Sequence, residues 1–352
     1  MNNQIRVNFN ESMSRTSIIL LLEAALSSKQ YRFARQTALA WLAIYPGDIK
    51  INSILAATLF GEGKVDQARS IWEKLLEKDP EFIDAYEQLS KSDYGVSAKL
   101  KSFYKAIIAS YASPTTPDSS LPEWVHSVQK IRQLYNSQQY DRAEEMIQKV
   151  LLLIPDHPIP AILQVLIKRA QQIDQTVRPI VELYHARWPE CIQFSLLLAE
   201  ARLASGEESE AVTLLHQCSV GDPAGQIPER IWGEDHPYKP LWPDRMSIIY
   251  DIQIPASVAS ILGWNQLTDG IKNDESSSED QTSVSDDSTS PIITNPELNQ
   301  KQDQILIQEE NYSPIPKVNE KESDINGVTE SVRVEFDKIA KKIKKPAISH
   351  SD

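Results

Sequence analysis

The stretch from residue 49 to residue 80 reads IKINSILAATLFGEGKVDQARSIWEKLLEKDP and determines the fold expected for this chain. Apolar residues recur three or four positions apart on both sides of Gly63, the spacing of one face of an α-helix. Pro80 follows the second run, at a place where proline ends a helix without breaking its hydrogen bonds. The stretch therefore predicts two helices joined by a short turn at Gly63.

The terminal proline of this stretch belongs to a repeating series. Prolines stand 34 residues apart in two sets of three, which are Pro46, Pro80 and Pro114, and Pro155, Pro189 and Pro223. A period of this length is typical of arrays of helix pairs. The two sets are separated by 41 residues, and the seven extra residues fall in a Pro- and Ser-rich run that predicts a loop.

Three further columns, each the set of residues at a fixed distance before the six prolines, repeat along the chain. Twelve residues before each proline the side chain is small in five of six cases, as expected where two helices cross closely. The members of this column are Ala34, Ala68, Ser102, Ala143, Val177 and Ala211. The positions five and eight before each proline are apolar throughout, and Trp72 and Leu75 are examples. One helix pair cannot bury such a face alone, so the pairs are expected to stack.

This pattern resembles the tetratricopeptide repeat family over about residues 15–223, as six units. The second and sixth units match best, whereas the third and fifth depart from the pattern at Lys99 and Asp174. The resemblance implies an all-α, right-handed solenoid of antiparallel helix pairs. We expect three repeats within residues 1–112, an inserted loop at 113–123 and three more repeats at 124–223.

The rest of the chain has a different composition. Residues 224–270 are rich in Trp and Pro, and we expect Trp232, Trp242 and Trp264 to cap the sixth repeat. With this cap, residues 15–270 are expected to form one continuous helical array without a sheet. Residues 271–330 contain 4 basic and 14 acidic side chains, a composition that predicts a disordered acidic linker. Residues 331–346 alternate apolar and Lys positions as a basic amphipathic helix does.

Composition argues against several classes of protein. The net charge of the 352 residues is −13, so the basic surface that nucleic-acid binding requires is not expected. Cys191 and Cys218 are too few for a disulfide framework or a paired-cysteine zinc site. The apolar run Ile18 to Leu22 is stopped by Glu23, and no apolar run approaches the roughly 20 residues that span a bilayer. No membrane span is therefore expected, and no signal peptide is recognisable. A cytoplasmic location is expected.

Catalytic motifs are not recognisable in the sequence. It has no Gly-rich phosphate loop, nucleophile elbow or HExxH helix, and its six histidines are isolated. His236 follows Glu234 and Asp235, but adjacent residues seldom converge on one ion, so a structural cap is favoured over a metal site. We therefore expect no enzyme activity, no cofactor and no metal.

The expected working surface is the concave groove that the family resemblance assigns to the first helix of each pair. Its middle would collect Lys91, Tyr94, Arg132, Tyr135 and Arg169. Aromatic and basic side chains together suit a peptide with acidic and apolar residues, and a solvated groove without a ligand is the competing interpretation. The acidic tail could itself contact this groove, as an intramolecular hypothesis.

Two function classes follow. The first is a non-enzymatic interaction scaffold that holds a protein or peptide segment in the groove. The alternative is a regulatory or substrate-recruiting N-terminal module of a larger or multi-subunit enzyme, for example a peptidase-like one, whose catalytic domain is not in this chain.

Overall fold

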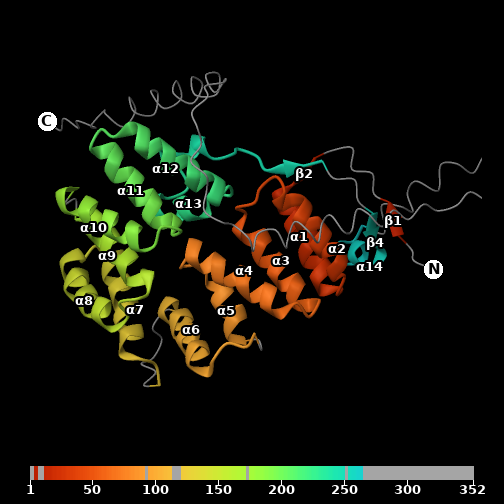
Figure 1. The fold of residues 1–352 in the computed structure, drawn as a ribbon, viewed down its shortest axis with the longest axis horizontal. Coiled ribbons are helices and arrows are strands. Elements are labelled where there is room, and N and C mark those ends of the chain that lie inside the picture. Colours follow the sequence, from red (N-terminus) through yellow and green to blue (C-terminus); the bar gives the residue numbers. More distant parts are fainter. Residues whose placement is uncertain are drawn as a thin grey trace, which may run out of the picture. The chain divides into compact units, whose positions relative to one another are not determined.

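The computed structural model describes residues 4–6, 12–91, 94–112, 120–171, 174–249 and 253–264 (Figure 1). All of them belong to one compact unit, Met1–Asp269. Six antiparallel helix pairs follow one another along the chain, which confirms the all-α solenoid. The first helices are α1 (Arg15–Ser27), α3 (Ile49–Gly61), α5 (Ile83–Lys91), α7 (Glu123–Asn136), α9 (Pro158–Ala170) and α11 (Ile192–Ala204). The second helices are α2 (Tyr31–Leu42), α4 (Val65–Lys78), α6 (Ala98–Tyr111), α8 (Tyr140–Leu153), α10 (Asp174–Arg187) and α12 (Glu208–Gly221).

The turns inside the first, second, fourth and sixth pairs each place one residue in the left-handed backbone region. Gly63 and Gly206 both have φ of 82°, a conformation that glycine adopts at little cost. Lys29 and Gln138 occupy the equivalent turns of the first and fourth pairs with φ of 58°. The same chain reversal is thus built in four pairs with only two glycines.

The repeated columns form the core. Ala34, Ala68, Ala143 and Ala211 are each 0% exposed, which confirms the close crossings expected from small side chains. The third pair differs, because Ser102 in the same column is exposed. Helix α6 buries Tyr104, Ala106, Ile107 and Ser110. The apolar column eight residues before the proline is therefore buried here at Ala106, whereas the small-residue column at Ser102 is not.

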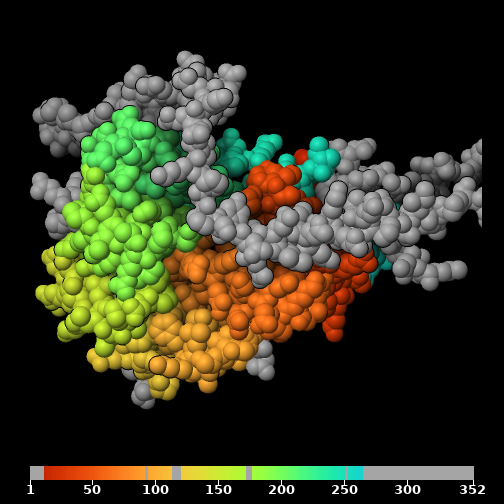
Figure 2. All heavy atoms as spheres, in the orientation of Figure 1, coloured from red at the N-terminus to blue at the C-terminus, as the bar shows by residue number. Residues whose placement is uncertain are grey.

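The pairs curve until the sixth returns to the first two. At Gly47, in the turn between α2 and α3, a Cβ atom would lie 2.1 Å from the backbone carbonyl oxygen of Val220 at the end of α12. Helix α13 (Gln226–Trp232) follows α12, and its Arg230 is paired with Asp79 in the turn between α4 and α5. In the space-filling view the colours follow one another around this arc (Figure 2).

The segment after α13 only partly follows the expectation of a cap on the sixth pair. The indole nitrogen of Trp242 donates to the carbonyl oxygen of Asp222, 2.8 Å away, next to the 3₁₀ helix η1 (Lys239–Leu241). The chain then crosses to the other end, where β3 (Ser247–Ile248) pairs with β2 (Met13–Ser14) and β4 (Gln253–Pro255) pairs with β1 (Gln4–Arg6).

Helix α14 (Ala256–Ile261) packs against α1, and Trp264 follows it. Two short antiparallel ladders thus interrupt the expected all-helical array. The physical reason is that the segment before α1 offers strand edges, which short extended stretches pair with. Most of the predicted loop, the acidic linker and the basic helix lie outside the described residues. Within the described part, no helix has the length and apolar character needed to cross a membrane.

Candidate binding cleft

Two of the five residues predicted for the groove lie on the third pair, where the structure gives them different surroundings. Lys91 is exposed, and its Nζ is 2.8 Å from a carboxylate oxygen of Glu87 on the same helix. Tyr94 is 1% exposed, because its ring lies 4.5 Å from that of Phe60 and 5.1 Å from that of Trp72, measured between centroids. Tyr94 is therefore a core residue and cannot contact a peptide.

The two arginines of the predicted groove already have carboxylate partners. Arg132 lies 2.9 Å from Glu81, and Arg169 donates two hydrogen bonds to Glu200, at 2.7 and 2.9 Å. Tyr135 packs edge-on against Tyr140. Since a carboxylate neutralises each guanidinium, neither arginine offers a free positive charge to an acidic ligand.

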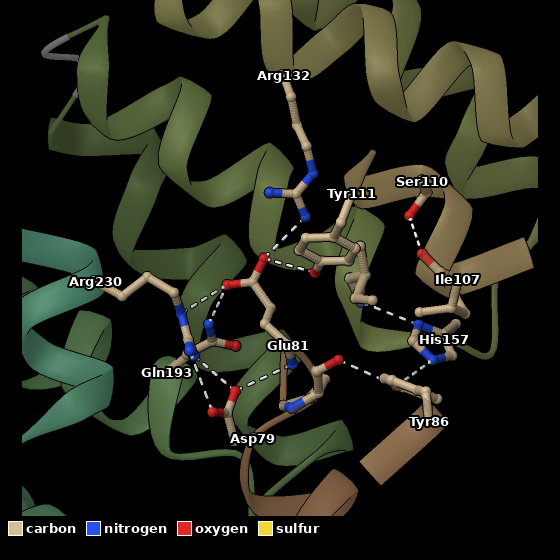
Figure 3. Close-up of polar contacts among 12 residues, drawn as sticks. Asp79, Glu81, Tyr86, Ile107, Ser110, Tyr111, Arg132, His157, Gln193 and Arg230 are labelled. Atoms are coloured by element: carbon tan, nitrogen blue, oxygen red, sulfur yellow. Dashed lines mark hydrogen bonds and ion pairs between the residues drawn. The ribbon is translucent and has the colours of Figure 1, made fainter. Parts of the chain in front are cut away.

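Sequence reasoning missed a buried polar cluster around Glu81, which joins the turn between α4 and α5 to the third, fourth and sixth pairs and to α13 (Figure 3). Its carboxylate accepts from Tyr111 at 2.8 Å, from Arg132 and from Gln193, and Arg230 lies 3.2 Å away. Asp79 completes the cluster with two hydrogen bonds from Arg230, at 2.6 and 3.2 Å. The members are Asp79, Glu81, Tyr111, Arg132, Gln193 and Arg230, and two carboxylates balance two guanidiniums.

The electrostatics of the Glu81 cluster follow from burial and from these pairs. Burial raises the pKa of Asp79, and Arg230 only partly offsets the rise. Burial acts on Glu81 in the same direction, but Arg132 and Arg230 together lower its pKa. A buried carboxylate stays charged only with such partners. Glu81 therefore holds its negative charge at the point where the pairs converge.

Next to the Glu81 cluster, Tyr86 and His157 connect the third pair to the fifth. The His157 ring caps α9, since its Nδ1 accepts from the backbone N–H of Ile159. Its Nε2 lies 3.1 Å from the Tyr86 hydroxyl, which donates to the carbonyl oxygen of Pro80. This arrangement places the imidazole proton on Nε2, and burial lowers the pKa of His157 to about 4. The histidine is neutral at physiological pH.

Beside this contact the surface opens into a cleft of ≈ 550 Å³. One wall comes from α4, α5 and α6, and the other from the start of α9 and the turn between α10 and α11. Its lining is mostly apolar and aromatic, with acidic residues and one arginine among it. The residues that the argument below uses are Glu73, Glu77, Leu100, Phe103, Arg187, Trp188 and Glu190.

The aromatic cleft, as we call this opening, differs from the predicted groove in position and chemistry. Most of its lining comes from second helices and the turns between pairs, with Tyr86 of α5 and the start of α9, whereas the predicted groove lay on the first helices alone. None of the five predicted residues lines it. Phe103 within α6 and Trp188 directly after α10 are partly exposed aromatic residues of the lining, and the repeated columns of the sequence contained no signal for either.

The described residues include no group of three or more His, Cys, Asp or Glu side chains that could hold an ion. His236 instead packs among the rings of Trp232, Tyr238 and Trp242. Both cysteines are buried, and burial raises the pKa of each to about 12, so their thiols are protonated.

Comparison with known proteins adds no functional assignment. A scan against protein-family models matches none, and a search among curated proteins finds no similar sequence.

Proposed function

We propose that this protein is a non-enzymatic interaction scaffold that binds a peptide or protein segment in the aromatic cleft. The observation that carries the proposal is the cleft itself, an open, mostly apolar depression of ≈ 550 Å³ whose walls come from separate helix pairs. Ligand sites have this character, with apolar walls and a few polar groups at defined places. The resemblance to tetratricopeptide repeats supports a role in protein recognition.

The walls of the aromatic cleft are held before any ligand arrives. The Tyr86–His157 hydrogen bond joins the third pair to the fifth, and the hydrogen bond from Gln193 to Glu81 joins the sixth pair to the turn before the third. A site whose walls are already positioned binds more tightly, because less conformational entropy is lost on binding. The structure thus favours recognition by a fixed surface.

Selection of peptides from a displayed library of short random sequences tests the proposal. The full chain serves as bait, and a parallel selection uses the Leu100→Ser variant. Leu100 lines the aromatic cleft and is 37% exposed, so its substitution changes the surface with little effect on folding. Leu20→Ser, on α1, is the matched control, because Leu20 is 52% exposed and lies outside the cleft.

The expected result is a set of peptides that bind the wild-type and Leu20→Ser chains and bind Leu100→Ser less well. Loss of an apolar contact of this size weakens binding by about three- to tenfold. A selection that yields no peptide sensitive to Leu100→Ser contradicts the proposed function.

A further inference from the structure

The charge at the aromatic cleft has the opposite sign to the one expected from the groove residues. Three carboxylates line it, those of Glu73, Glu77 and Glu190, against the single guanidinium of Arg187. Arg187 is already paired with Asp156 at 2.8 Å. Among the described residues, neither Glu77 nor Glu190 makes an ion pair. The cleft therefore presents uncompensated negative charge.

The aromatic wall of the cleft is formed by rings that already have partners. The guanidinium of Arg187 lies over the Trp188 ring, 4.7 Å from its centroid. Phe194 stacks against the same ring with 5.7 Å between centroids, so Trp188 contributes an apolar wall to the cleft. Phe103 lies across the cleft on α6 and offers a second partly exposed ring.

We propose that the aromatic cleft binds a peptide segment that places the charge of a Lys or Arg side chain against Glu77 and Glu190 and its apolar residues against the cleft wall. The proposal rests on the scaffold function and specifies its partner as a basic segment with apolar neighbours. The apolar neighbours would occupy the wall around Leu100. Both features are needed, because the lining is mostly apolar with charge at its edge.

An acidic peptide fits this site poorly. Its carboxylates would approach Glu77 and Glu190, and like charges at close range disfavour binding. The arginines that suggested an acidic partner, Arg132 and Arg169, are neutralised by Glu81 and Glu200. A basic ligand therefore finds opposite charges at Glu77 and Glu190, whereas an acidic ligand finds no unpaired positive charge among these residues.

The composition of the selected peptides and two charge variants test the proposal. Peptides that lose binding to Leu100→Ser are sequenced, and one is synthesised with its basic residue intact and with that residue replaced by Gln or Glu. Affinities are measured by fluorescence anisotropy with the full chain at low and high salt. The double variant Glu77→Gln/Glu190→Gln is compared with Glu145→Gln/Glu210→Gln, which changes two exposed acids outside the cleft.

We expect the cleft-dependent peptides to be enriched in Lys or Arg beside apolar residues. Neutralising Glu77 and Glu190 should weaken binding by about three- to twentyfold, and high salt should reduce the difference. The Glu145/Glu210 control should bind as the wild type does, which separates the cleft from general attraction to an acidic protein.

Two results would overturn the basic ligand while leaving the scaffold function intact. One is cleft-dependent peptides that are neutral or acidic. The other is a basic peptide whose affinity changes equally in the Glu77/Glu190 and Glu145/Glu210 variants. Failure to select any peptide sensitive to Leu100→Ser instead refutes the proposed function and this inference together.

Discussion

Replacement of Arg230 by Met is the sharpest test of how the helix pairs are held in a closed arc. Arg230 on α13 makes two hydrogen bonds to Asp79 and lies 3.2 Å from Glu81. Met keeps most of the apolar stem and removes the charge. The variant therefore leaves Asp79 without its cationic partner, while Glu81 keeps its contact with Arg132.

The magnitude follows from the burial of the two partners. The Asp79 side chain is 2% exposed, and that of Arg230 is 36% exposed. Removing one partner of a fully buried pair costs about 3–5 kcal/mol, whereas exposed pairs contribute about 0–1 kcal/mol. Because solvent reaches Arg230, we expect Arg230→Met to lower the free energy of unfolding by about 2–3 kcal/mol.

The dependence on pH gives this prediction a second, independent signature. Burial already raises the pKa of Asp79, and loss of Arg230 raises it further. A carboxyl whose pKa is raised on folding stabilises the fold most at low pH, and this contribution is lost as the pH rises through the folded pKa. The deficit of Arg230→Met should therefore be largest at neutral pH and shrink as Asp79 takes up a proton.

Urea denaturation of the full chain, followed by far-ultraviolet circular dichroism, measures the effect. Arg187→Met is the matched control, because its pair with Asp156 is exposed. Asp79→Asn removes the charge that needs a partner, so adding Arg230→Met to it should cost much less than in the wild type. Three results would refute the reasoning. They are a loss of stability in Arg230→Met equal to that in Arg187→Met, a loss that does not change with pH, and a loss that is the same in the Asp79→Asn background.

Three further predictions use the same denaturation assay. Ala68→Leu should lower the free energy of unfolding by about 1–3 kcal/mol through overpacking. Ser102→Leu, at the exposed equivalent position in the third pair, should leave it nearly unchanged. Equal effects of the two substitutions would show that the third pair follows the common register. Gly47→Ala should also cost about 1–3 kcal/mol, because its Cβ would meet the backbone carbonyl of Val220, and an unchanged midpoint would argue against the closed arc. Burial lowers the pKa of His157 from 6.5 to about 4, so its contribution to stability is complete above pH 6.5 and is lost as the pH falls through about 4. The free energy of unfolding of His157→Asn should therefore fall less steeply over this interval than that of the wild type. Parallel curves of stability against pH would contradict this.

The helix pairs could be predicted from the sequence because each depends on residues close together in the chain. The columns of small and apolar side chains report local crossings, and those of Ala34, Ala68, Ala143 and Ala211 are buried as expected. The proline spacing is only partly right in the third pair. There Ala106 is buried as its column predicts, but Ser102 of the small-residue column is exposed and α6 buries Tyr104 instead.

The candidate site could not be predicted in the same way, because it depends on contacts between distant pairs. Glu81 contacts Arg132, Gln193 and Arg230, the last two more than 100 residues away in sequence. A repeating pattern contains no signal for such contacts, since it describes each pair against its neighbour. For the same reason, Arg132 looked like a free groove residue when it is the internal partner of Glu81.

The cost of burying the Glu81 cluster indicates what the cluster contributes. Buried ion pairs are seldom a strong source of stability, because desolvation offsets much of the attraction. They do fix geometry, since a misplaced partner leaves a charge without compensation. Here the cluster holds the sixth pair and α13 against the turn between α4 and α5. The walls of the aromatic cleft come from α4, α5 and α6 on one side and from the start of α9 and the turn between α10 and α11 on the other. The cluster therefore holds together elements that carry the two walls of the cleft, which no single helix pair contains.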